Sequence, residues 1–207
     1  MQIKPEELDN NGYVLIDSLG HKELIPFVRT YLKKRTKISS FYTVSNIIIV
    51  VAIIFCFWQN YGIDDFSLGS GITYFTYGMA IAFGLIPLHE FIHVLAYKSQ
   101  GAEKTSYGAN LKKFHFMAIA DKFVANKKEF QVVALAPFVV ISIILGILLF
   151  FVSNLWDFTI LGILLTHTAF SSGDFGLLSY FEFNNDREIV TYDDKENSIS
   201  YFYGKIK

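Results

Sequence analysis

Two histidines and a glutamate stand at the spacing of a zinc-binding pair in His89-Glu90-Phe91-Ile92-His93. Residues four positions apart share one face of a helix, so the imidazoles of His89 and His93 can bind one zinc ion. Glu90 is not needed as a ligand and is free to deprotonate a zinc-bound water. In the alternative, structural interpretation the three side chains only pair with one another. An apolar run surrounds them, and burying an ionisable group in lipid costs at least ~2 kcal/mol. Such residues are expected there only where a function requires them, which favours zinc binding.

The composition is that of a membrane protein. Hydrophobic residues make up 52% of the 207 residues, and charged residues make up 18%, below the ~25% usual in soluble domains. The net charge of −1 gives no reason to expect nucleic-acid binding, which requires a basic face. Cys56 is the single cysteine, which excludes an internal disulfide and a cysteine-based zinc site. The first ~40 residues are polar, so we expect no cleavable signal peptide.

Four apolar runs approach the ~20 residues needed to cross a bilayer. They are residues 41–58, 72–97, 132–152 and 158–181. We therefore predict an α-helical integral membrane protein, with four transmembrane helices and small cytoplasmic β-hairpin elements. The predicted parts are a cytoplasmic N-terminal segment, a four-helix membrane domain and a cytoplasmic hairpin tail, at 1–40, 41–181 and 182–207.

The basic residues predict how these spans are oriented. Of the 18 lysines and arginines, seven precede the first span, seven lie between the second and third, and four follow the fourth. The other two loops contain none. By the positive-inside rule, both termini and the middle loop face the cytoplasm. We expect a multi-pass protein of the cytoplasmic membrane.

Asp174 and Glu90 are the carboxylates inside the predicted spans. In this orientation the second and fourth spans run in the same direction. His89 and Asp174 each lie ~17 residues, or about 25 Å of helical rise, beyond the outer ends of their spans. Asp174 is therefore predicted at the depth of the histidines, where it completes a three-ligand zinc site with an open position for water. The alternative is that Asp174 caps a broken helix near residues 171–173.

His167 lies seven residues before Asp174, so both lie on one helix face about 10 Å apart. Three roles are open for His167. It could stabilise an oxyanion on the substrate, or form a hydrogen bond to Asp174 as a metal ligand. It could also form a hydrogen bond to a backbone carbonyl of a neighbouring helix.

Pro87 predicts a bend in the second span. Inside a helix, proline removes one backbone hydrogen bond and frees the carbonyl of Phe83. With Gly84 one turn earlier, a bend just outside the histidines would open space for water and substrate. The alternative is that proline and glycine are common in membrane helices and carry no meaning here.

The segments outside the spans carry weaker patterns. Residues 20–37 read as an amphipathic helix, which could lie on anionic lipid or pack on the protein's own cytoplasmic face. Residues 104–107 and 113–118 read as short strands, whose edge could bind an extended peptide by strand addition. Residues 188–203 alternate in the manner of a β-hairpin.

These residues resemble the bacterial Putative zincin peptidase family, small membrane proteins related in plan to site-2 proteases. The resemblance rests on the His-Glu-x-x-His segment, on Ala136-Pro137 opening the next span and on residues 171–174 in the last, and it covers the chain from about Tyr74 onward. It implies zinc held by His89, His93 and Asp174, with Glu90 as catalytic base. Site-2 proteases usually place their aspartate before Gly-Gly in a Pro-rich segment that contains Asn. Asp174 instead precedes Phe175, which leaves the oxyanion stabiliser unassigned.

We therefore expect a zinc metalloprotease that cleaves a membrane-associated peptide or a single-span protein in contact with the lipid bilayer. The alternative is a non-catalytic metal-binding membrane protein, such as a sensor, a scaffold or a transporter component. A transporter would need polar residues along a path through the membrane, whereas the polar residues here gather near one depth. An inactive, protease-derived binding protein is a third possibility.

Overall fold

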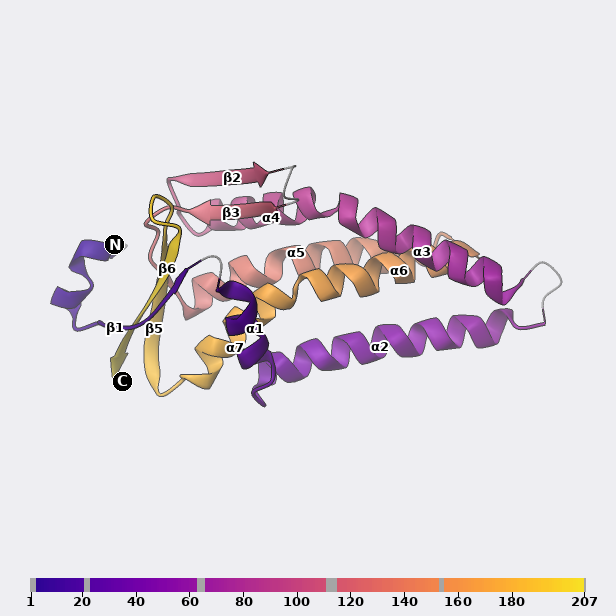
Figure 1. Cartoon of the computed structure of the whole chain (residues 1–207), viewed down its shortest axis with the longest axis horizontal. Helices are drawn as coiled ribbons and strands as arrows, with labels where there is room; N and C mark the ends of the chain where they lie inside the picture. The colour runs from indigo at the N-terminus through magenta and orange to yellow at the C-terminus, as the bar shows by residue number, and fades with distance from the viewer. Residues whose placement is uncertain (1–2, 21–22, 63–65, 111–114, 153–154, 207) are drawn as a thin grey trace.

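The computed structural model describes residues 3–20, 23–62, 66–110, 115–152 and 155–206. It is mostly helical, and the described strands gather toward the end of the molecule where both chain termini lie (Figure 1). The helices are α1 (Leu24–Leu32), α2 (Lys37–Asn60), α3 (Leu68–Gly84), α4 (Ile86–Ser99), α5 (Lys127–Leu148), α6 (Leu155–Phe170) and α7 (Ser172–Phe183), after 3-10 turns at Pro5–Glu7 and Asp9–Asn11. The strands are β1 (Val14–Gly20), β2 (Thr105–Asn110), β3 (His115–Ala120), β4 (Ala125–Asn126), β5 (Arg187–Asp194) and β6 (Ile199–Ile206).

Two of the described helices are long and apolar enough to cross a membrane: α2 with 24 residues and α5 with 22. The pair α3 and α4 adds a third crossing if the two are counted as one bent span. These elements correspond to the first three apolar runs of the sequence. The Thr36 hydroxyl caps α2, and the Asn126 side chain caps α5, each by accepting backbone N–H groups of the first turn.

The predicted bend of the second span is confirmed. The axes of α3 and α4 differ by 44° across a break at Leu85, which ends α3 and precedes the first residue of α4. Pro87 lies in the first turn of α4, where its missing N–H would have no intrahelical partner in any case. The chain therefore restarts its helix just before the two histidines.

The fourth apolar run, 158–181, is not one continuous helix. It divides at Ser171 into α6 and α7, so the break of the alternative interpretation is present, but the N-cap of α7 is Ser171 and not Asp174. The Ser171 hydroxyl donates to the carbonyl of His167 at 3.1 Å, and such local bonds compete with regular helix geometry. The 16 residues of α6 rise only about 24 Å, less than the ~30 Å hydrocarbon core.

The first helices of the two broken pairs, α3 and α6, approach each other backbone to backbone, and the two are called the outer half below. A Cβ atom at Gly78 would overlap the carbonyl oxygen of Thr159, and one at Gly162 would overlap that of Phe75. Small residues allow such close approach between apolar helices. This contact fixes α3 against α6 and so positions the elements that follow each of them.

The described strands form two sheets. One is the antiparallel sheet β1-β6-β5-β4, and the other is the hairpin β2-β3. The β5–β6 hairpin confirms the prediction for residues 188–203, and β2 and β3 confirm the two short strands, apart from 113–114, which lie outside the described residues. β1 was not predicted. It pairs with β6 from Val14↔Gly204 to Gly20↔Ile199, so the N-terminal segment and the tail share one sheet.

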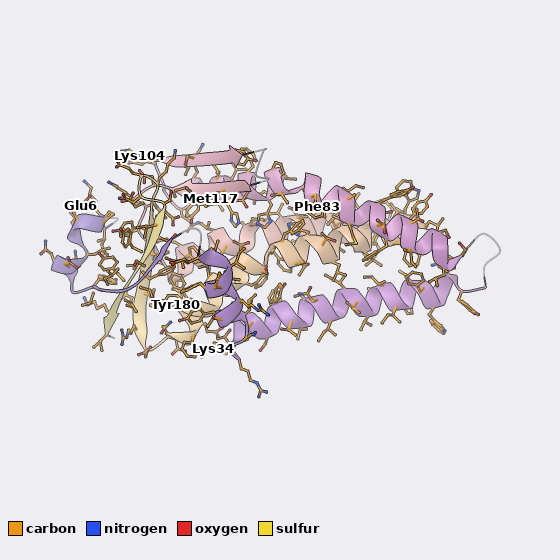
Figure 2. The ribbon with its side chains drawn as sticks, in the orientation of Figure 1. Glu6, Lys34, Phe83, Lys104, Met117 and Tyr180 are labelled. Carbon is orange, nitrogen blue, oxygen red and sulfur yellow. The ribbon has the colours of Figure 1, made fainter. Side chains whose placement is uncertain are left out.

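The predicted amphipathic helix is shorter than 20–37, because the chain up to Gly20 belongs to β1. Its buried residue Val28 packs directly against Gly176 of α7. The rings of Phe27 and Tyr31 lie 5.1 and 4.9 Å from that of Tyr180, which is labelled in Figure 2. α1 therefore packs on the protein itself, the second of the two interpretations.

Candidate metal centre

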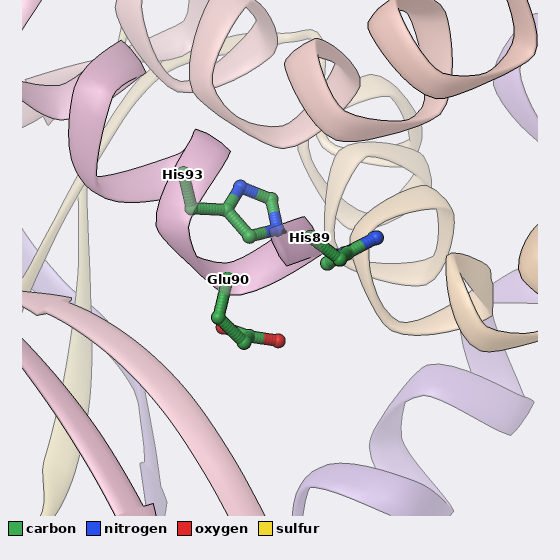
Figure 3. Close-up of side chains that lie close together, drawn as sticks. All are labelled: His89, Glu90 and His93. Atoms are coloured by element: carbon green, nitrogen blue, oxygen red, sulfur yellow. Dashed lines mark hydrogen bonds between the residues drawn. The ribbon is translucent and has the colours of Figure 1, made fainter. Parts of the chain in front are cut away.

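One turn of α4 presents His89, Glu90 and His93 together (Figure 3). Both histidines are buried, with 6% and 7% of their surface exposed. One donor atom from each of the three side chains lies within 4.8 Å of the others, and the group could hold a metal ion. The i, i+4 spacing of the sequence therefore produces the paired imidazoles that it predicted.

Asp174 lies in the first turn of α7 and faces the same histidines. Its two carboxylate oxygens lie 3.3 Å from Nε2 of His89 and 3.3 Å from Nε2 of His93. The two Nε2 atoms are 3.2 Å apart. The structure thus brings together the three side chains that the sequence placed at one depth, although they come from separate helices.

The spacing of these donors matches a zinc site. Bonds of about 2.0–2.1 Å at tetrahedral angles place the ligand atoms about 3.3–3.4 Å apart. The Nε2 atoms of His89 and His93 are 3.2 Å apart, and each lies 3.3 Å from a different oxygen of the Asp174 carboxylate, which is close to this spacing. Glu90 offers a further carboxylate within 4.8 Å of the imidazoles.

The far side of the His93 ring is held by a backbone carbonyl. Nδ1 of His93 donates to the carbonyl of Val133 on α5 at 2.9 Å, so in the neutral ring Nε2 is the nitrogen that can bind a cation. Pro137, inside α5, has no N–H to bond the carbonyl four residues before it. Pro137 therefore frees the carbonyl that orients His93, as metal-binding histidines usually require.

His167 of α6 lies behind His89. Its Nε2 is 3.1 Å from Nδ1 of His89. If His89 is to bind a cation through Nε2, its Nδ1 carries the hydrogen and donates it to His167. The other ring nitrogen of His167 is buried without a hydrogen-bond partner in the described part of the chain. A buried polar atom without a hydrogen bond lowers the stability of the fold by about 1–3 kcal/mol. His167 is therefore better explained by its hydrogen bond to His89 than by a contribution to stability. The described bond goes to His89, and not to Asp174 as one prediction had it.

Glu90 is anchored by the β2–β3 hairpin. Its Oε2 accepts the backbone N–H of Ala118 on β3 at 2.9 Å. The bond orients the carboxylate beside the histidines and brings one edge of β3 against α4.

A cavity of about 340 Å³ opens on these residues. His89, Glu90, His93 and Asp174 line it, together with mainly apolar side chains. Its wall also includes Leu19 of β1 and residues of β5 and β6, so the four-stranded sheet completes the cavity.

Three contributors to the site were not predicted from the sequence: the Val133 carbonyl, the Ala118 amide and Tyr97, which lines the cavity. A signal existed for two of them. Pro137 marks the carbonyl of Val133, and Tyr97 continues the four-residue spacing of His89 and His93. A backbone amide on a distant hairpin leaves no such signal.

Fold and site together define a helical protein, apolar enough for a membrane, with a buried His-Glu-x-x-His group able to hold a metal ion. The sequence profile of the family described as "Putative zincin peptidase" matches residues 82–186. That is 105 of the 207 residues, and the chain belongs to this family. Searches of curated proteins and of solved structures found no match.

Proposed function

We propose that this protein is a zinc-dependent membrane metalloprotease that hydrolyses peptide bonds of membrane-associated substrates. The observation that carries the proposal is the convergence of two imidazole nitrogens and one carboxylate at 3.2 to 3.3 Å from one another. Membership of a zincin family supports the same chemistry.

We assign His89, His93 and Asp174 as the metal ligands. Val133 and His167 hold the outer nitrogens of the two rings. With the ring hydrogens on these outer nitrogens, both Nε2 atoms are left for the metal, as a metal ligand must be. When bound, zinc would polarise the scissile carbonyl and lower the pKa of a water molecule in its open position.

Glu90 is the general base in this proposal. One of its oxygens is fixed by Ala118, and we assign the other to proton transfer. It takes a proton from the attacking water and later passes that proton to the leaving amine.

We further propose four membrane crossings: α2, the pair α3–α4, α5 and the pair α6–α7. None of the most apolar 18-residue window of α2 is buried inside the protein, which suits a helix surrounded by lipid. The distribution of basic residues supports cytoplasmic termini at both ends of the chain. The catalytic group then lies toward the cytoplasmic side, with 1–40 and 182–207 outside the membrane domain 41–181.

The proposed substrate is a membrane-associated peptide or a single-span protein, bound as an extended strand. β3 pairs with β2 along one edge. Its Ala118 N–H points the other way, toward Glu90. That second edge carries no strand among the described residues, and it borders the cavity through Met117 and Ala118. A substrate strand added there would lie beside the metal ligands.

The test compares membrane proteomes of cells that make the wild-type protein or Glu90→Gln, with zinc measured in both purified proteins. We expect about one zinc per chain in each, and new peptide ends only with the wild type, since losing a general base costs about 10²–10⁴-fold. Equal cleavage by Glu90→Gln would remove Glu90 from its role. Zinc in both proteins without cleavage in either would support the alternative, a non-catalytic metal-binding protein.

A further inference from the structure

Tyr97 follows His93 by one turn of α4. Four residues span about 6 Å of helix, and helical side chains lean toward the N-terminus, so its phenol extends back toward the turn of His93. Tyr97 is 8% exposed. It lines the same cavity as His89, Glu90 and Asp174.

The ring of Tyr97 has a firm support. Phe123 meets it edge-on, with ring centroids 6.1 Å apart at 82°. The carbonyl of Tyr97 accepts the backbone N–H groups of Gln100 and Ala102, each at 3.1 Å. A group held in this way is already oriented before a ligand enters.

Carboxylates from three elements line the cavity together with Tyr97. They belong to Asp193 of β5, Asp174 of α7 and Glu90 of α4. Two of the three belong to the proposed catalytic group, so Tyr97 shares one cavity with the proposed reacting groups.

Peptide hydrolysis builds negative charge on the carbonyl oxygen, and one hydrogen-bond donor aimed at that oxygen is worth about 10²–10³ in rate. The other hydroxyls that line the described part of the cavity are occupied. Thr191 donates to the carbonyl of Tyr201, and Ser200 donates to Asp193. The Tyr97 hydroxyl has no hydrogen-bond partner among the residues that the structure describes. It is the side-chain donor left for a substrate.

We propose that Tyr97 is a further catalytic residue, whose hydroxyl donates a hydrogen bond to the oxyanion of the hydrolysis reaction. The role rests on the proposed protease function. As the water oxygen bonds to the carbonyl carbon, the π electrons of the carbonyl move onto its oxygen, and Tyr97 stabilises that charge while keeping its own proton. When the C–N bond breaks, these electrons reform the carbonyl, and the proton held by Glu90 passes to the leaving nitrogen.

The first test is equilibrium binding to the purified, zinc-loaded protein. The probe is N-phosphoryl-Leu-Phe, whose tetrahedral phosphoryl group imitates the charged intermediate, and plain Leu-Phe is the comparison. Tyr97→Phe keeps the ring and its contact with Phe123. We expect it to bind N-phosphoryl-Leu-Phe about 10–100-fold more weakly, with Leu-Phe affinity, zinc content and thermal midpoint unchanged.

Tyr74→Phe is the matched control, since Tyr74 lies on α3 outside the cavity lining and packs against Trp156. It should leave every one of these quantities unchanged. Equal loss of affinity for Leu-Phe and N-phosphoryl-Leu-Phe in Tyr97→Phe would mean that Tyr97 only shapes the cavity, and would overturn the proposal. So would unaltered binding of both.

The second test is cleavage of the peptide that the proteome comparison identifies. Tyr97→Phe should lower kcat about 10²–10³-fold with little change in KM. If the wild type cleaves and Tyr97→Phe cleaves equally well, the role of Tyr97 fails and the protease function stands. If the wild type keeps its zinc but neither cleaves a substrate nor binds N-phosphoryl-Leu-Phe, both proposals fail.

Discussion

The two halves of the broken helix pairs differ in what holds them together. In the outer half, α3 and α6 meet through Gly78 and Gly162, backbone against backbone. In the inner half, α4 and α7 meet through His89, His93 and Asp174, whose polar atoms lie 3.2 to 3.3 Å apart. The outer contact is close backbone packing, and the inner contact consists of the side chains that we assign as metal ligands. The breaks at Leu85 and Ser171 separate the two kinds of contact, so packing and chemistry can be altered independently.

Asp174→Asn should have the largest effect, confined to the inner half. The amide removes the negative charge between two imidazoles and leaves a poor zinc ligand. We expect a greater loss of zinc affinity than the about 10–100-fold caused by changes behind the ligands. Metal analysis after dialysis against a chelator measures it. Retention of one zinc per chain would show that Asp174 is not a ligand.

Gly162→Ala tests the outer half. Its Cβ would meet the backbone carbonyl of Phe75, which cannot move aside cheaply, so we expect a loss of about 1–3 kcal/mol of stability. Gly146→Ala is the control, because a Cβ there meets nothing within 4 Å. The midpoint temperature of thermal unfolding in detergent should be lowered by Gly162→Ala alone. A similar decrease in both variants would refute the close contact.

Pro137→Ala should separate stability from metal affinity. Alanine restores an N–H that competes with His93 for the carbonyl of Val133. Zinc affinity should fall about tenfold, as for other changes behind a ligand, while the helix itself becomes no less stable. Pro26→Ala, in the first turn of α1, should leave zinc affinity as it is. Unaltered affinity in Pro137→Ala would remove Val133 from the metal site.

Tyr13→Phe is expected to have the smallest effect, because Tyr13 lies just before β1 and outside both halves. The Tyr13 hydroxyl donates to Glu188 at 2.9 Å, and losing this bond should cost about 1 kcal/mol. Burial, and then the Glu188 carboxylate, raise the pKa of Tyr13 to about 12. The contribution of this hydrogen bond to the stability of the fold is therefore complete below the usual tyrosine pKa of about 10. It is lost as the pH rises through about 12.

Unfolding of wild type and Tyr13→Phe, followed by circular dichroism between neutral and strongly alkaline pH, checks this expectation. The difference between the two proteins should shrink as Tyr13 ionises. Glu188→Gln keeps an acceptor and should show a smaller loss at neutral pH. A constant difference across the titration would contradict the assignment.

The inner half was largely predictable from the sequence, since few side chains allow its chemistry. Two histidines at i and i+4, one further acid at equal depth and one proline before them specified the site and its bend. The sheet was less predictable, because β1 pairs with β6 across nearly the whole chain. The partner of His167 was not predictable either, since helix spacing gives a face and not the ring that meets it. The break at Ser171 stood among the alternatives, and the structure contains it.

The cavity wall has a consequence for biosynthesis. β6 supplies Ser200 and Phe202 to that wall, and the ribosome makes β6 after all the helices of the bundle. A nascent chain that already carries His89, His93 and Asp174 therefore still lacks one wall of the cavity around them. Synthesis of β6 and its pairing with β1 would complete that wall. Under the proposed function, the cavity would become competent only after this strand has been made.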